Sequence, residues 1–204
     1  DNIADVNTVA DNIATIASKV SGDGTVNPTN LISNGSFEAW SAGTSAAPDG
    51  WTNDGGGTVA REGTVIKFGT YSCKIGVGYI HQDIHTEKGI AYWNGRTVTF
   101  GCWVWSDTAS KTGLQIYDGV DATNSTKHSG GSSWEWISVT HTVNSSATSV
   151  LIYLTALTPV TNSYFDGAMC VEGSSAFAFS PKPAEEGVWA DYSATSTIVG
   201  WAAG

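Results

Sequence analysis

The spacing of hydrophobic residues changes near residue 30. Before that point, apolar residues recur at alternating intervals of three and four, and after it they alternate with polar residues over several short runs. The first spacing is that of a helix in a coiled coil, and the second is that of a strand with one buried face. The pattern therefore predicts an N-terminal helix followed by an all-β domain.

The predicted helix carries one apolar stripe, and the Ser21-Gly22-Asp23-Gly24 sequence ends it. The stripe consists of Ile3, Val6, Ala10, Ile13, Ala17 and Val20. A lone helix of this length is marginal in water. We therefore predict a parallel stalk in which several copies of the chain bury the stripe together, with a helix packed on its own domain as the alternative. The stripe itself leaves the number of copies open.

Three runs in the β region show clean alternation, at 96–107, 134–143 and 149–157. Their predicted core faces are Val98, Phe100, Cys102 and Val104, then Ile137, Val139, His141 and Val143, then Val150, Ile152 and Leu154. Further strands are predicted within 71–84, 112–119 and 163–173. The Gly-, Asn- and Ser-rich stretches 53–57, 117–133 and 144–149 are interpreted as connecting loops. About eight such strands favour a β-sandwich.

Composition narrows the functional classes. A chain of 204 residues with 41% hydrophobic residues has room for one domain plus appendages. The net charge of −10 argues against nucleic acid and anionic membranes as partners, and the absence of an apolar run of ~18 residues argues against membrane insertion. Cys73, Cys102 and Cys170 lie in strand-like runs without a C-x-x-C pair, which predicts buried free thiols.

Seven segments in order resemble family 4/9-type carbohydrate-binding modules: NLISNGSFEAW, APDGWTNDG, FGTYSCKI, IHQDI, RTVTFGCWVWS, WEWISVTHTV and SYFDGAMCVEG. The resemblance implies a jelly-roll sandwich. The opening helix resembles repeats in the tail fibres of T7-like and marine phages, which also carry jelly rolls with an ending of the VEG…FAFSPKP type. The expected domains are a coiled-coil stalk helix at 1–22, the sandwich at 23–181, and a connector to a further domain at 182–204.

The two resemblances together imply a segment of a viral tail fibre rather than an enzyme, since we find no convincing nucleophile–base pair and no paired acids. It would act as a homotrimer that attaches the virion to a host cell-surface glycan, or that spaces the fibre tip, alongside other tail proteins. The implied location is the virion, assembled in the host cytoplasm. The alternatives are a carbohydrate-binding accessory module of a secreted glycan-degrading enzyme, and a structural fibre segment without a ligand.

Aromatic residues supply the candidate ligand or interface site. Trp105 and Trp136 occupy positions that are polar or basic in the resembled family, so each is expected to meet either a glycan or a neighbouring chain. Trp103 occupies a family tryptophan position, as does Trp134, and a structural role is favoured for both. The remaining candidates, expected on the same sheet surface, are Tyr153, Tyr117 and Gln115.

Two carboxylates match family positions that hold a structural calcium ion, Glu38 and Asp166. Calcium takes several oxygen ligands, and a backbone carbonyl from the 69–74 segment would add one. The alternative is that each carboxylate caps a loop without metal. His81, Asp83 and His85 alternate along a predicted strand, and we favour a solvated or interface face over a metal or acid–base site.

Overall fold

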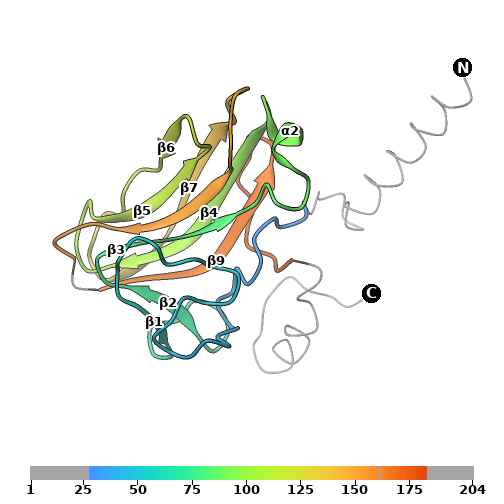
Figure 1. Cartoon of the computed structure of the whole chain (residues 1–204). Helices are drawn as coiled ribbons and strands as arrows, with labels where there is room; N and C mark the ends of the chain where they lie inside the picture. Colours follow the sequence, from blue (N-terminus) through green and yellow to red (C-terminus); the bar gives the residue numbers. More distant parts are fainter. Residues whose placement is uncertain (1–27, 161, 183–204) are drawn as a thin grey trace, which may run out of the picture.

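The computed structural model describes residues 28–160 and 162–182, which form an all-β sandwich of two antiparallel sheets (Figure 1). This architecture confirms the predicted all-β class. The predicted stalk stripe, from Ile3 to Val20, and the predicted connector beyond Lys182 lie outside the described residues.

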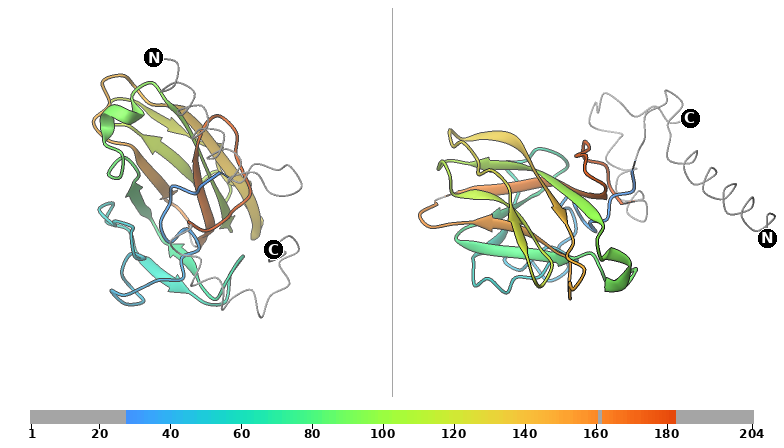
Figure 2. Two further views of the ribbon diagram at one scale, coloured as in Figure 1. Left: turned by 90° about the vertical axis from the view of Figure 1, so that its right-hand side faces the viewer. Right: turned by 90° about the horizontal axis from the view of Figure 1, so that it is seen from above.

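Within the described part of the chain, one sheet has five strands and the other has four. The five-stranded sheet has the order β1 (Val59–Glu62), β2 (Ser72–Ile75), β9 (Ser163–Glu172), β4 (Thr97–Ser106), β7 (Ser133–Thr142). The four-stranded sheet has the order β3 (Gly78–Asp83), β8 (Leu151–Ala156), β5 (Thr112–Tyr117), β6 (Ala122–Asn124). Figure 2 shows the sandwich from two further sides. The short α2 (Ile90–Trp93) closes one end, and no described helix is long and apolar enough to cross a membrane.

The core lies between the sheets and follows the predicted alternation. Val98, Phe100 and Cys102 of β4 are fully buried, and they share the core with Ile152 and Leu154 of β8. Burial of one such side chain contributes ~1.5–3 kcal/mol, which is why strict alternation fixes the face each strand presents. All three cysteines are buried and free, as predicted.

The sequence pattern leaves the division of one segment open and misses a strand in another. Residues 71–84 form two strands, β2 and β3, which belong to different sheets, and the chain changes sheet at Gly76 and Val77. Gly78 has a φ of 127°, and a Cβ there would lie 2.6 Å from the Gly57 Cα. The expected loop at 117–133 contains β6, a three-residue edge strand. Its burial pattern gives it no apolar face, so periodicity carries no signal for it.

The two ends of the described chain lie side by side (Figure 1). Asn30 joins them: its Nδ2 donates to the Ser180 and Ala168 carbonyls, and its Oδ1 accepts from the Ile32 and Cys170 amides. The chain therefore begins and ends the sandwich at one place, and both flanking segments attach there.

Candidate functional site

The outer face of the four-stranded sheet carries three tyrosines among polar side chains, and we call it the tyrosine face. Strand pairing places its outward residues in three rows across the sheet: Tyr79–Thr155–Gly113, His81–Tyr153–Gln115–Asn124 and Asp83–Leu151–Tyr117–Ala122. The alternate residues of the same strands, among them Ile80, Ile152 and Leu114, are fully buried in the core. The pleat therefore fixes which side chains face outward.

Tyr153 lies at the centre of this face. Its ring centroid is 5.3 Å from that of Tyr79, in an edge-to-face arrangement, and 5.1 Å from that of His81. Tyr79 remains 39% exposed. Partial burial raises the pKa of the Tyr153 hydroxyl, and the nearby Asp54 carboxylate raises it further. The result is a partly shielded aromatic floor with hydroxyl and carboxylate groups around it.

A glycine-rich loop, residues 53–57, forms one rim of the tyrosine face. Thr52 pairs with His81 and fixes the start of the loop against the edge of β3. A Cβ on Gly55 would lie 2.7 Å from the Tyr79 ring, so only glycine allows this loop to pack so closely on the tyrosine. The loop brings an Asp54 carboxylate oxygen to 3.2 Å from His81 Nδ1.

Polar side chains surround the rest of the face. Gln115 Nε2 donates to Asn124 Oδ1 at 3.0 Å, which links the side chains of β5 and β6. In the row of Tyr79 and Thr155, Lys127 Nζ donates to Thr155 Oγ1 at 3.0 Å. Such amides, hydroxyls and charged groups are the types that recognise sugar hydroxyls, while tyrosine rings offer flat apolar surface to the C–H faces of a sugar.

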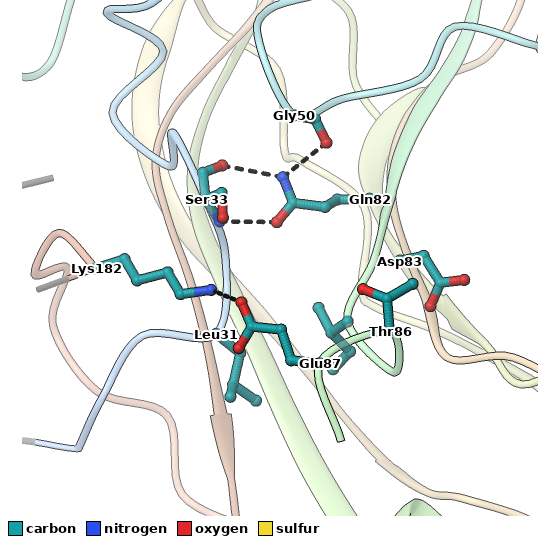
Figure 3. Close-up of a pocket in the computed structure, with 9 residues that line it drawn as sticks. Leu31, Ser33, Gly50, Gln82, Asp83, Thr86, Glu87 and Lys182 are labelled. Carbon is teal, nitrogen blue, oxygen red and sulfur yellow. Dashed lines mark hydrogen bonds and ion pairs between the residues drawn. The ribbon is translucent and has the colours of Figure 1, made fainter. Parts of the chain in front are cut away.

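A cavity of about 190 Å³ lies at the edge of β3, and Asp83 of the tyrosine face is among its lining residues. Figure 3 shows Gln82 bonded to Ser33 and Gly50, and Lys182 bonded to Glu87. The Gln82 amide bonds Ser33 through both backbone groups and also donates to the Gly50 carbonyl, while Lys182 pairs with Glu87. These bonds tie the leading segment and the end of the described chain to β3, so the cavity is a structural crevice.

The outer face of the five-stranded sheet carries a second aromatic cluster, the tryptophan face. Trp103 pairs with Trp136 and Trp105 with Trp134 across β4 and β7. Trp103 and Trp136 meet edge to face at 5.9 Å, and Trp105 meets Tyr164 at 5.0 Å. All four tryptophans are half-buried rather than part of the core. Trp103 and Trp105 lie on one face of β4, and Trp134 and Trp136 on one face of β7, as alternation predicts; strand pairing brings the two pairs together.

Parts of the chain itself cover the outer side of the five-stranded sheet. Lys67, in the loop between β1 and β2, places its Nζ 3.9 Å above the Trp103 ring. Phe68 of the same loop meets Phe179 of the final segment at 5.4 Å. Lys74 Nζ lies 5.4 Å from the Tyr164 ring centroid. The tryptophan face is thus partly covered and basic at its border, in contrast to the tyrosine face.

The structure divides the predicted aromatic set between two sheets. Trp105, Trp136 and Trp103 lie on the tryptophan face, whereas Tyr153, Tyr117 and Gln115 lie on the tyrosine face. The expectation of one shared surface is therefore wrong. Its cause is that alternation assigns a residue to an inner or outer side of its strand but does not tell which sheet the strand joins.

Glu38 and Asp166, the predicted calcium ligands, bond to the same loop. Asp166 Oδ2 accepts from the Lys67 and Phe68 amides, and Glu38 Oε1 accepts from the Thr70 and Tyr71 amides. Burial raises the pKa of both carboxyl groups, that of Asp166 well above its ordinary value. The described residues contain no cluster of three acidic, histidine or cysteine side chains. These amide bonds match the alternative in which each carboxylate caps a loop, and a hard cation would need further oxygens from backbone carbonyls.

The alternating His81, Asp83 and His85 do not converge on one point. His81 contacts Asp54, while His85 Nδ1 contacts Asp83. The arrangement agrees with the favoured interpretation of a polar face. Tyr79 and Asp54 were missed as site residues. The signals that point to them are the outward position of Tyr79 two residues before His81 and the glycine run after Asp54, which marks a loop that can approach an aromatic ring closely.

A buried polar cluster joins the two sheets at their β6 and β7 edges. His141 Nε2 of β7 lies 3.0 Å from Asp118 Oδ2, and its Nδ1 lies 2.9 Å from Thr123 Oγ1 of β6. Asp118 also accepts from the Val120, Asp121 and Asn144 amides. Because Asp118 and His141 are buried, with their polar atoms bonded inside the cluster, we interpret it as a structural link between the sheets.

Comparison with solved structures assigns the fold. The xylan-binding domain of carbohydrate-binding module family 22 aligns with a TM-score of 0.56 and 18% identity, covering 73% of this chain and 98% of that one. A family 16 carbohydrate-binding module aligns with a TM-score of 0.51 and 22% identity, covering 70% and 100%. The sandwich shares the jelly-roll fold of these modules. The predicted jelly roll is confirmed.

A viral protein also shares the fold. The enzymatically active domain of tailspike protein 4 from bacteriophage CBA120 aligns with a TM-score of 0.52 and 17% identity, covering 71% of this chain but 22% of that domain. No family model and no curated protein matches the chain. At these identities the likeness concerns the fold, and function has to be argued from the surfaces described above.

Proposed function

We propose that the protein binds glycans through the tyrosine face. The observation that carries the proposal is Tyr153, an aromatic floor at the centre of a sheet face with Tyr79 and Tyr117 beside it and amide, hydroxyl and carboxylate groups around it. Sugar rings bind by stacking their C–H faces on aromatic rings while their hydroxyls bond polar side chains. The jelly-roll neighbours whose names state xylan or carbohydrate binding support this choice.

Alanine at Tyr153 tests the proposal. We expect Tyr153→Ala to lower the affinity for a bound polysaccharide by about 30-fold or more, because a central aromatic anchor typically contributes ~2 kcal/mol or more. Affinity electrophoresis against a panel of soluble polysaccharides measures it. Tyr71→Ala is the matched control, since Tyr71 lies outside the face beneath Arg61. Equal affinity of the Tyr153 variant and the unmutated protein for every retained polysaccharide contradicts the proposed site.

We further propose that this module is part of a viral tail fibre, assembled as a homotrimer in the virion and used for host attachment. The bacteriophage tailspike neighbour supports this setting, as does the heptad-like stripe of the first twenty residues. Trp105 and Trp136 would then lie at the contact between chains. Alanine at either position should weaken assembly more than it destabilises the single fold, as measured by sedimentation against chemical unfolding.

The alternative is an accessory module of a glycan-degrading enzyme, which the xylan-binding neighbours favour to a similar degree. The two differ in assembly. An enzyme-linked module is expected to be monomeric, whereas a fibre segment is expected to be trimeric. The mass of the full chain in solution therefore decides between them, while glycan binding through the tyrosine face is common to both.

A further inference from the structure

The tyrosine face carries negative charge at its centre. Asp54, whose side chain is 56% exposed, stands on the rim loop, and Asp83 stands one row away on β3. Both carboxylates act on the Tyr153 hydroxyl, and after partial burial they are among the groups that raise its pKa. A saccharide that stacks on Tyr153 therefore places its substituents in a negative potential.

The cations near this centre do not outweigh the carboxylates. Each of the two carboxylates has one histidine beside it, His81 at Asp54 and His85 at Asp83. A histidine beside a carboxylate can at most balance the charge of that carboxylate, so neither pair is positive. Lys127 lies one row from Tyr153 at the end of the face and uses its ammonium on Thr155. Beyond the face, the whole chain has a net charge of −10, which repels polyanions at long range.

We infer that the tyrosine face selects its saccharide by charge: it takes uncharged glycans and rejects glycans that carry carboxylate, sulfate or phosphate groups. The inference rests on the proposed glycan-binding function. Its physical basis is that like charges at the rim of a binding surface reduce both association rate and affinity, whereas sugar hydroxyls donate hydrogen bonds to the same carboxylates without that cost. Asp54 and Asp83 would be the residues that determine this specificity.

The experiment uses the full chain at pH 8 and low ionic strength, where charge effects are least screened. The neutral probes are xylan, galactomannan and hydroxyethyl cellulose. The acidic probes are polygalacturonate, alginate and carboxymethyl cellulose, the last sharing its β-1,4-glucan backbone with hydroxyethyl cellulose. We expect at least one neutral polymer to retard the protein in a Tyr153-dependent manner and no acidic polymer to do so.

Removal of the two carboxylates supplies the second arm. Asp54→Asn with Asp83→Asn should raise the affinity for an acidic polymer by about fivefold per carboxylate, with a smaller change for the neutral polymers. Asp49→Asn with Glu62→Gln is the matched control, because it changes the net charge equally at residues outside the face.

The outcomes separate the inference from the function on which it rests. If an acidic polymer retards the protein and Tyr153→Ala abolishes this retardation, the charge selection is wrong, but the proposed glycan binding still stands. If the double aspartate variant binds acidic polymers no better than the unmutated protein, the charge selection is also wrong, because the two carboxylates are then not its cause. Failure of every polymer, neutral and acidic, to retard the protein overturns the proposed function itself.

Discussion

Asp118 shows how one buried carboxylate links the two sheets. Its carboxylate accepts hydrogen bonds from three backbone amides and from the His141 ring nitrogen. Burial opposes ionisation, but these four bonds lower the pKa of Asp118 from 3.8 to about 2. A carboxyl whose pKa is lowered in the folded state contributes stability above the pKa it has in the unfolded chain. This contribution is lost as the pH falls through the folded pKa.

We therefore expect the free energy of unfolding to fall between about pH 4 and pH 2 and this fall to be smaller in Asp118→Asn. At pH 7 the same variant should be destabilised by about 3 kcal/mol, because an amide cannot accept all four bonds. Urea unfolding across this pH range measures both effects. Asp121→Asn, in the same loop but exposed, is the control, and an equal pH profile for both variants would contradict the assignment.

Glu38 and Asp166 form the second residue-level prediction. Asp166 is buried and Glu38 is half-buried, and both carboxylates bond to the same loop. We propose that they hold a structural calcium ion. A ligand at a hundred times its Kd stabilises by ~2.7 kcal/mol, so chelator should lower the melting temperature of calcium-loaded protein by about 5–10 °C. Differential scanning calorimetry measures the shift. Asp166→Asn should abolish the effect of chelator on the melting temperature, whereas the control Glu62→Gln should retain it. Equal melting temperatures of calcium-loaded and chelator-treated protein would contradict the proposed site.

At the level of elements, the register of β4 and β7 builds the tryptophan face. The Trp136 indole lies over Gly101, where a Cβ would be 2.3 Å from Trp136 Cζ2. Gly101→Ala should therefore displace the indole, destabilise the fold by about 1–3 kcal/mol, and change tryptophan fluorescence. Gly63→Ala is the control, because the nearest atom to its new Cβ would be 3.8 Å away. Unchanged fluorescence and stability in Gly101→Ala would show that Trp136 does not rest on Gly101.

At the level of the whole molecule, the juxtaposed ends determine how the sandwich is mounted. Because Asn30 bonds Ser180, the preceding and following segments attach at one end, next to Phe179 on the outer side of the five-stranded sheet, while the tyrosine face belongs to the other sheet. A domain mounted in this way can present its tyrosine face to a glycan and its tryptophan face to a neighbouring chain. In the proposed fibre, the predicted stalk would set how many copies assemble.

The predicted stalk makes assembly testable. We expect the full chain to have the mass of three chains of 21.3 kDa in light scattering at micromolar concentration. Ile13→Asp should lower that mass, because a carboxylate in a shared apolar seam has no counter-charge. Ser18→Asp adds the same charge to the polar side of the predicted helix and should leave the mass unchanged. A single-chain mass for the unmutated protein would contradict the trimer.

The sequence by itself determined the class of the fold and the side to which most residues face. Alternation over 96–107 and 134–143 placed Val98 and Phe100 inside and the indoles of Trp103 and Trp136 outside, because the pleat has a period of two and burial enforces it. Short edge strands such as β6 give no periodic hydrophobic signal, since they bury no alternating face.

Only the tertiary structure decided which outward residues share a surface. Strand order sends β4 and β7 to one sheet and β5 and β8 to the other, so Trp105 and Tyr153 lie on opposite sides although both alternate outward. The loop at 53–57 reaches Tyr79 and His81 through a strand bridge at Thr52. These contacts depend on hydrogen bonds between segments far apart in the chain, which local periodicity does not encode, and they bring the residues of the tyrosine face together.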